Sequence, residues 1–212
     1  MKSTEYQYIL QLLKIAKAAK ICYHFTDEVE LIMNNELTFE ILYKSEITDE
    51  RFSTFFSFLE QAMFKEEYRS FSHQKSLINN DCYKILFCFQ NKTVVGVLAF
   101  WELDDFVFIE HFIVGKTARN QGVGSKMLKF LKSNCFSTVI LEVELPYNEI
   151  NKRRIAFYER NGFCFNDFEY YQCPLNKGDE PLPLRIMSSP LPLKKEDFEK
   201  VKQTLIRTVY NA

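Results

Sequence analysis

The segment of this sequence best suited to bind a ligand is a turn with two glycines at the predicted start of a helix. The apolar run 106–114 leads through a short loop to Arg119, and Gly122 and Gly124 follow. Glycine lets the backbone approach a ligand closely, and a helix N-terminus offers unpaired N–H donors at its positive end. These features favour a phosphate or pyrophosphate site, with a plain strand-to-helix turn as the alternative. The spacing matches neither the dinucleotide-binding pattern nor the P-loop pattern.

Glu110 interrupts the apolar run just before this turn. A carboxylate is costly to bury unless it is paired or used chemically. Burial is expected to raise its pKa from about 4.3 toward a value that suits a proton acceptor. The alternative is a salt-bridged side chain on a half-exposed face. The neighbouring His111 has the opposite strand parity, so we expect it on the other face in a structural role.

A second candidate segment is the predicted helix over residues 148–160. Asn151, Ile155 and Tyr158 are spaced i, i+4 and i+7, which places them on one helix face. That face can present an amide and a phenol to one ligand. The alternative for Tyr158 is a buried core tyrosine with a satisfied hydroxyl. Gly162 is expected to end the helix in the left-handed conformation.

These two segments together resemble the GNAT N-acetyltransferase superfamily. Arg119-x-x-Gly122-x-Gly124 matches its Q/R-x-x-G-x-G/A acyl-CoA signature, and residues 151–163 match the helix motif that follows at the expected spacing. The similarity covers about residues 38–188 and is to bacterial members that also carry a Pro-rich loop before a final strand.

The resemblance implies roles for individual residues. The strand before the signature splays from its neighbour and binds pantetheine through its backbone, and the turn holds the pyrophosphate. The implied cofactor-binding residues are Phe112, Ile113, Val114, Arg119, Asn120, Gln121, Gly122, Val123, Gly124, Ser125 and Asn151. Glu110 would be the catalytic base, and Tyr158 the acid that protonates the departing thiolate. The family has a small residue where this chain has Arg154, which leaves open whether Arg154 points toward the CoA phosphates or to solvent.

The implied activity is direct transfer of the acetyl group of acetyl-CoA to a primary amine of a small molecule or peptide. No cysteine nucleophile and no metal are expected. The alternatives are a non-catalytic acyl-CoA-binding sensor or interaction module and, from the glycine turn alone, a nucleotide-binding regulator.

The periodicity of the chain predicts the elements that position these residues. Expected strands are 38–43, 83–90, 93–100, 106–114, 138–145, 163–172 and 184–188, and expected helices are 4–21, 49 to about 72, 122–133, 148–160 and 195–209. Asn91-Lys92 is expected to form a hairpin turn. This order predicts an α/β (α+β) fold with a mixed, mostly antiparallel central sheet of about six to seven strands flanked by helices. We expect a helical extension over 1–34, a GNAT domain over 35–190 and a C-terminal helix over 191–212 packed on it.

Composition supports a globular chain. The 212 residues include six glycines, six prolines and 16% aromatic residues, and 27 basic and 28 acidic residues give a net charge of −1. The balanced charge indicates no nucleic-acid partner. Lysines within the apolar stretch 8–22 exclude a signal peptide or membrane span there, so we expect a cytoplasmic monomer or homodimer. Six cysteines without a C-x-x-C pair and three scattered histidines indicate no metal site.

Overall fold

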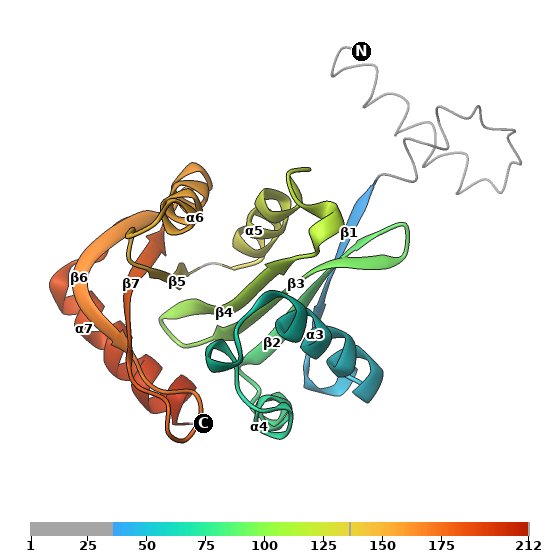
Figure 1. Cartoon of the computed structure of the whole chain (residues 1–212), viewed down its shortest axis with the longest axis horizontal. Coiled ribbons are helices and arrows are strands. Elements are labelled where there is room, and N and C mark those ends of the chain that lie inside the picture. The colour runs from blue at the N-terminus through green and yellow to red at the C-terminus, as the bar shows by residue number, and fades with distance from the viewer. Residues whose placement is uncertain (1–35, 136, 212) are drawn as a thin grey trace, which may run out of the picture. The chain divides into compact units, whose positions relative to one another are not determined.

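A single seven-stranded sheet organises the computed structural model, which describes residues 36–135 and 137–211. The strand order is β1-β2-β3-β4-β5-β7-β6, and every neighbouring pair is antiparallel except β4 with β5 (Figure 1). The strands are β1 Leu37–Leu42, β2 Tyr83–Gln90, β3 Thr93–Glu102, β4 Phe106–Val114, β5 Thr138–Glu144, β6 Cys164–Gln172 and β7 Leu182–Ser189. The predicted mixed sheet is confirmed. The helix expected over 4–21 lies outside the described residues.

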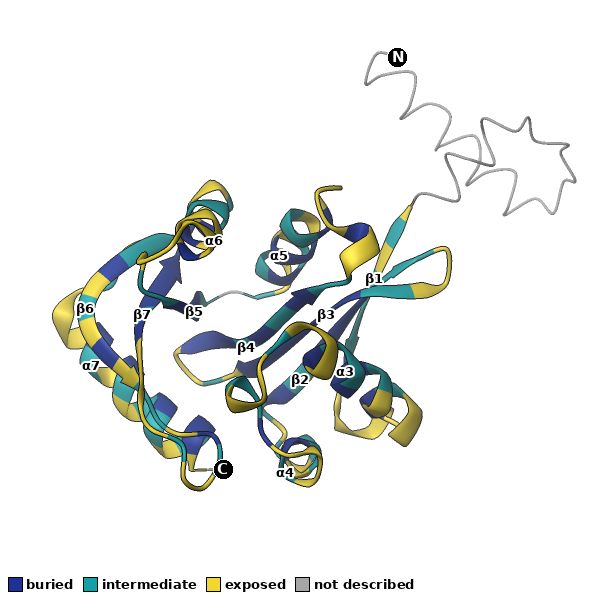
Figure 2. Ribbon diagram, viewed as in Figure 1, coloured by how far each residue is buried: buried dark blue, intermediate teal, exposed yellow. Residues whose placement is uncertain are grey.

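Helices cover both faces of this sheet and divide the core in two. The helices are α3 Asp49–Ala62, α4 Phe71–Ser76, α5 Val123–Ser133, α6 Glu149–Arg160 and α7 Lys195–Thr204, which continues as a π-helical segment, Leu205–Tyr210. Apolar residues of α3, α7 and the π-helical segment pack on one face, and those of α5 and α6 on the other. Buried residues lie along the central strands and on the inward sides of the helices (Figure 2).

The parallel pair β4 and β5 joins for only part of its length. Pairing runs from Phe106 opposite Thr138 to Ile109 opposite Leu141 and then stops. Beyond that point β4 stays paired with β3 as far as Val114, and β5 stays paired with β7 as far as Glu144. Residues 110–114 therefore have an edge toward β5 with no strand partner among the described residues. The splay implied by the family resemblance is present.

A β-bulge lies where the two strands part. Ala99 of β3 pairs with His111, and the next β3 residue, Phe100, pairs with Ile109, so Glu110 is the extra residue of β4. A bulge bends its strand and increases the local twist, which accounts for the divergence of β4 from β5. It also changes the side-chain alternation. Glu110 and His111 both face the α3 side, where their partners Trp101 and Phe55 lie, so the expectation that they face opposite sides is wrong.

The hairpin between β2 and β3 forms at the predicted turn. Asn91 and Lys92 have φ values of 51° and 64°, which are left-handed conformations typical of a type I′ turn. A residue other than glycine pays roughly 1–2 kcal/mol for this conformation.

We therefore expect Lys92→Gly to raise the free energy of unfolding by about 0.5–1 kcal/mol, as measured by urea denaturation. The matched control is Lys129→Gly at an exposed position of α5, which should lower it by about 1 kcal/mol because glycine is a poor helix former. Equal losses in both variants would contradict the turn assignment.

Candidate active site

A cleft of about 680 Å³ opens between the end of β4, the turn before α5, and α6. It brings together nine of the thirteen predicted site residues: Phe112, Val114, Arg119, Asn120, Gly122, Val123, Gly124, Ser125 and Tyr158. Arg154, Arg160 and Asn161 complete the α6 side. Of the other four, Ile113 faces the opposite side of the sheet, toward α3, and Gln121, Asn151 and Glu110 do not line the cleft.

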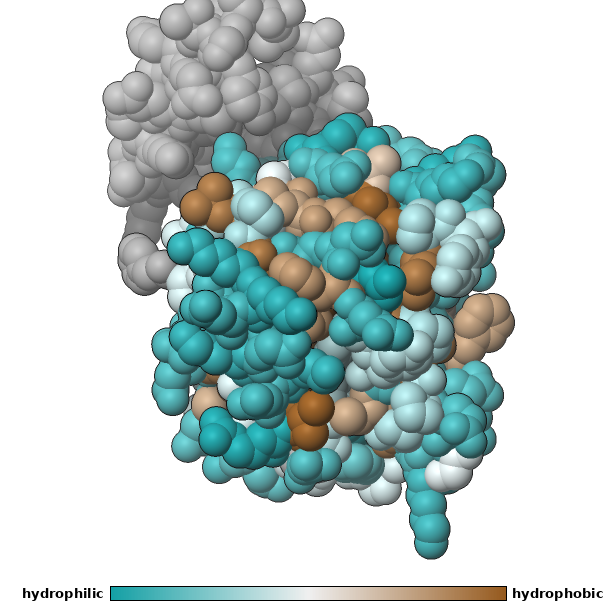
Figure 3. Space-filling model, turned by 90° about the vertical axis from the view of Figure 1, so that its left-hand side faces the viewer, coloured by the Kyte–Doolittle hydropathy of each residue, from teal (hydrophilic) through white to brown (hydrophobic). Residues whose placement is uncertain are grey.

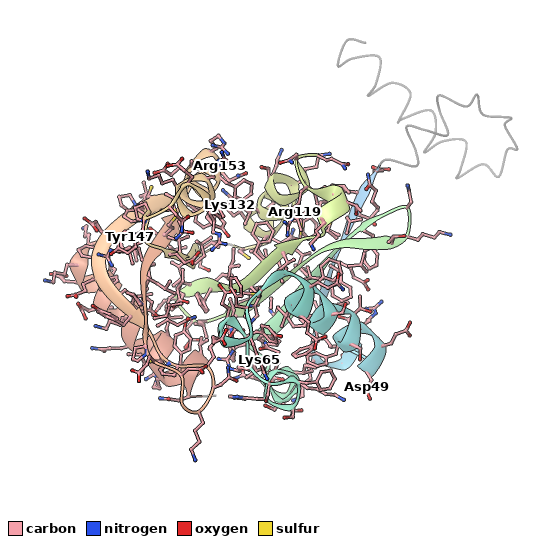
Figure 4. All side chains as sticks on the ribbon, viewed as in Figure 1. Asp49, Lys65, Arg119, Lys132, Tyr147 and Arg153 are labelled. Atoms are coloured by element: carbon pink, nitrogen blue, oxygen red, sulfur yellow. The ribbon has the colours of Figure 1, made fainter. Side chains whose placement is uncertain are left out.

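The turn before α5 directs backbone donors toward this cleft. Asn120 and Gly122 have left-handed φ values of 62° and 75°, and Gly122 is the N-cap of α5. The first amides of a helix have no intrahelical partner, so those of Val123 to Ser125 are available to a ligand. Arg119 bonds the carbonyl of Val114 through Nε at 3.1 Å, which leaves the two terminal guanidinium nitrogens for other partners (Figure 4). The arrangement combines amide donors, a helix N-terminus and cationic side chains, which suits a phosphate group.

Gly124 has a separate role from Gly122. A Cβ at Gly124 would lie 3.1 Å from the ring of Phe157 and 3.4 Å from that of Phe112, whereas a Cβ at Gly122 would meet nothing within 4 Å. Gly124 therefore lets α5 approach α6 and β4 closely. Lys132 of α5 also donates to the carbonyl of Asn161 at the end of α6, and so ties the same two helices together (Figure 4).

Tyr158 is held in a ring of aromatic side chains at the inner wall of the cleft. It is 8% exposed, and its ring centroid lies 5.3 Å from that of Phe157 and 5.7 Å from that of Phe163. Burial raises the pKa of Tyr158 to about 12, against the opposing charge of Arg154, so the phenol keeps its proton at neutral pH. A hydroxyl of this kind can act as a proton donor to a group bound in the cleft.

The end of α6 fixes this tyrosine through a Schellman motif. Gly162 is left-handed at φ 80°, as expected, and its N–H donates to the carbonyl of Glu159 at 2.9 Å. The next N–H, of Phe163, donates to the carbonyl of Tyr158 itself at 3.1 Å.

Asn151 and Arg154 occupy different places on α6. Asn151 is 7% exposed, and its Nδ2 donates to the carbonyl of Leu145 at 3.0 Å, which anchors the loop between β5 and α6. Arg154 lines the cleft and forms an ion pair with Glu144 of β5. The guanidinium therefore lies at the wall of the cleft with Glu144 as its counter-charge.

Glu110 lies on the other face of the sheet, in a buried ion pair. Its carboxylate accepts from Arg69, whose side chain is 1% exposed, and from the indole Nε1 of Trp101 at 3.2 Å. Burial alone would raise the pKa of Glu110, but Arg69, His111 and the indole outweigh it and hold the pKa below its usual range. The expectation of a raised pKa is wrong, because the sequence showed no sign that Arg69 would be its partner.

Glu142 of β5 is a second carboxylate at the parting point, and sequence reasoning missed it. It follows Leu141, the last β5 residue paired with β4, as Glu110 follows Ile109. Its donors are all neutral: the hydroxyls of Tyr170 and Tyr210 and the amide of Gln172 at 3.0 Å. Burial raises the pKa of Glu142 to about 7, although these hydrogen bonds oppose the shift. The available signal was the one used for Glu110, an acid within an apolar strand.

His111 adds a neutral imidazole beside Glu110 and Arg69. It is 2% exposed, and neither ring nitrogen has a hydrogen-bond partner among the described residues. Burial lowers its pKa to about 4, with Glu110 opposing and Arg69 reinforcing the shift. In the described part of the chain, no group of three or more His, Cys, Asp or Glu residues could hold a metal ion, and no helix has the length and apolar character needed to cross a membrane.

Comparison with known proteins decides the family. The family model of the acetyltransferase (GNAT) family matches residues 44–163, which spans both motifs and the splayed strands. The chain belongs to the GNAT acetyltransferase family. Family membership supports an acyltransferase activity, and the matched range contains the parting of β4 and β5 and the residues of the cleft.

Individual relatives agree with this membership. A GNAT-family protein from Bacteroides thetaiotaomicron, provisionally described as an acetyltransferase, is 30% identical, with a TM-score of 0.75 over 82% of this chain and 99% of that chain. YjbC of Bacillus subtilis (strain 168), whose name also assigns it provisionally as an acetyltransferase, is 33% identical over 103 residues. That match covers 46% of this chain and 50% of the relative, so the chain spans about half the length of YjbC. The ribosomal-protein-S18-alanine N-acetyltransferase of Escherichia coli shares the fold at 19% identity, with a TM-score of 0.54 over 76% of this chain and 98% of that chain.

We expect Arg69→Met to lower the free energy of unfolding by about 3–5 kcal/mol at neutral pH, because it leaves a buried carboxylate without its counter-charge. Burial then raises the folded-state pKa of Glu110 above its unfolded value. The loss should therefore shrink as the pH falls and the carboxyl becomes neutral, and it should grow as the pH rises. Urea denaturation at several pH values measures both effects.

The matched control is Arg51→Met, because Arg51 pairs with Glu40 at 3.0 Å between side chains that are 37% and 42% exposed. An exposed pair contributes about 0–1 kcal/mol. Adding Glu110→Gln to Arg69→Met should recover much of the lost stability. Equal, small losses in the two arginine variants would show that the buried pair does not compensate Glu110.

Proposed function

We propose that this GNAT protein is an acetyl-CoA-dependent N-acetyltransferase that transfers the acetyl group directly to a primary amine of a small molecule or peptide. The observation that carries the proposal is the cleft, in which the amides of the glycine turn, the splayed edge of β4 and the buried phenol of Tyr158 face one space. A related fold, Naa50 of Arabidopsis thaliana, was solved with the bisubstrate analogue CoA-Ac-MVNAL, and it is 18% identical with a TM-score of 0.52. That complex supports a CoA-bearing ligand in this fold.

The residues of the cleft fit such a ligand. The turn from Arg119 to Ser125 would hold the pyrophosphate through backbone amides, with Arg154 and Arg160 adding positive charge. The backbone of residues 112–114, on the edge of β4 that lacks a strand partner, would bind the pantetheine amides. Asn151 is assigned here to anchoring the β5–α6 loop, through its bond to Leu145. Its predicted contact with the cofactor has no support from its position.

The chain supplies the proton transfers at the point where β4 and β5 part. We assign the proton acceptor for the substrate ammonium to Glu142, directly or through one water, because its neutral partners leave it able to bind a proton near neutral pH. Glu110, the base expected from the sequence, instead keeps its negative charge against Arg69. A backbone N–H near Phe112 would polarise the thioester carbonyl, and Tyr158 would give its proton to the departing thiolate. No cysteine takes part.

Turnover with an amine panel tests this proposal. Purified protein should release free CoA from acetyl-CoA only when an amine is present, and mass spectrometry should show the acetylated amine. The panel covers amino acids, polyamines, aminoglycosides and peptide N-termini. Tyr158→Phe should lower kcat about 100-fold or more and leave the Kd for acetyl-CoA within about two-fold, because it removes a proton donor and no binding group.

The control variant is Tyr147→Phe, because Tyr147 is 81% exposed near the start of α6 and should retain full activity. Tight binding of acetyl-CoA without acetylation of any amine would replace the enzyme with a non-catalytic acyl-CoA-binding module. A melting temperature that rises with ATP and not with CoA would indicate a nucleotide-binding regulator.

The pH dependence of kcat separates the two carboxylates. If Glu142 is the proton acceptor, kcat should rise with pH through an apparent pKa of about 7, because the protonated carboxyl cannot accept a proton. Glu142→Gln should abolish this limb and lower kcat about 100-fold, and Glu110→Gln should leave the limb in place. The pKa values of Glu110 and His111 both lie well below 7. A limb at such a low pH would therefore assign the role of proton acceptor to one of these two residues and not to Glu142.

A further inference from the structure

The C-terminal segment crosses the gap between the two parted strands. On the β5 side, the hydroxyl of Tyr210 donates to Oε1 of Glu142 at 2.5 Å. On the β4 side, the carbonyl of Val209 accepts from Nη2 of Arg69 at 2.7 Å, and Arg69 in turn holds Glu110. Two consecutive residues of one π-helical turn therefore connect the first unpaired carboxylate of each strand.

We propose that Val209 and Tyr210 are positioning residues of the active site, which set the place and the protonation of the carboxylate pair at the parting of β4 and β5. The inference rests on the proposed function of that pair. It adds to the site a segment from the far end of the chain, outside both motifs and outside the region matched by the family model. Neither residue needs to touch the substrate.

The segment is well suited to hold a position. Val209 is fully buried, Tyr210 is 8% exposed, and both pack in the core on the α3 side of the sheet. Burial, with the neighbouring charge of Glu142, raises the pKa of Tyr210 well above its usual value, so its hydroxyl remains a donor at all relevant pH values. A fixed donor of this kind costs little reorganisation when the carboxylate changes charge.

Tyr210 is one of the few groups that can set the pKa of Glu142. The groups that face this carboxylate are Tyr170 and Gln172 of β6, Tyr210, and the negative charge of Glu110 across the gap, with Cys173 nearby. Gln172 also donates to the Tyr210 hydroxyl at 3.3 Å, so it orients both members of the contact. Arg69 bonds to Glu110 and to the carbonyl of Val209, and no cation among the described residues contributes to the pKa shift of Glu142. Neutral hydrogen-bond donors therefore stabilise the charged form of Glu142, whereas a counter-ion stabilises that of Glu110.

Tyr210→Phe tests the inference, because it removes one hydroxyl from an otherwise unchanged ring. The lost bond favours the charged carboxylate, so the pKa of Glu142 should rise. The acidic limb of kcat should then move to higher pH by about one unit, with kcat at pH 7 lower by about five-fold and the KM for acetyl-CoA unchanged. In a Glu142→Gln background, Tyr210→Phe should add less than about two-fold, because the two residues act through one contact.

The matched control is Tyr171→Phe, the same change on β6, where the exposed hydroxyl donates to Glu169 at 3.2 Å. It should leave the pH profile in place. A merely structural role for Tyr210 predicts lower thermal stability without a shift in the limb, and that result would overturn the inference.

A carbon-13 NMR titration of the glutamate carboxyls, with Glu142 assigned by Glu142→Gln, separates this inference from the proposed function. An unchanged Glu142 titration in Tyr210→Phe overturns the inference, whether or not the wild type acetylates amines. A titration that moves to higher pH supports the contact. If the wild type then acetylates no amine in the panel, the proposed function alone fails.

Discussion

The parting of β4 from β5 beyond Ile109 and Leu141 is the constraint on which the rest of the site depends. Each strand keeps its other neighbour, β3 or β7, so the sheet remains one body while one internal edge opens. The bulge at Glu110 makes the opening local, because it bends β4 at the residue where pairing with β5 ends. The cleft then lies on the α5 and α6 side of this opening, and the carboxylate pair lies on the α3 side.

Next to the opened edge, each strand carries a buried carboxylate with its own polar partners. Arg69 compensates Glu110, three neutral donors compensate Glu142, and an indole completes the set. A buried ion pair adds little stability over a well-packed apolar replacement. The pair of Arg69 and Glu110 keeps this carboxylate charged next to Glu142, whose pKa is raised, and this difference fits the proposed division of roles.

Local patterns predicted most of the fold, and long-range contacts explain what they missed. The bounds of β2 and β4 match the expected strands, the hairpin forms at Asn91-Lys92, and Gly162 ends α6 as expected, since each depends on neighbours within a few residues. The prediction for the side-chain direction of His111 was wrong because one bulged residue reverses the alternation of the strand. No residue type in the sequence indicates that bulge. The charge state of Glu110 failed because its partner lies 41 residues away, in a short connection between helices.

Glu142 is a second residue whose environment could not be predicted from the sequence. Its position inside an apolar strand was visible, but its partners come from 28 and 68 residues along the chain. The environment of a buried acid is set by elements that meet only in the folded state. Periodicity can therefore identify a buried acid, while its protonation requires the three-dimensional partners.

The two glycines of the signature meet two different physical demands. Gly122 has open space around it but a left-handed backbone, so it is needed for the direction of the turn. Gly124 has no left-handed backbone, but a Cβ there would lie only 3.1 Å from the ring of Phe157, so a side chain would be crowded. Phe157 is adjacent to Tyr158 and packs against its ring. Through Phe157, the turn that would hold the pyrophosphate packs next to the phenol that would protonate the thiolate, so the two motifs are in direct contact.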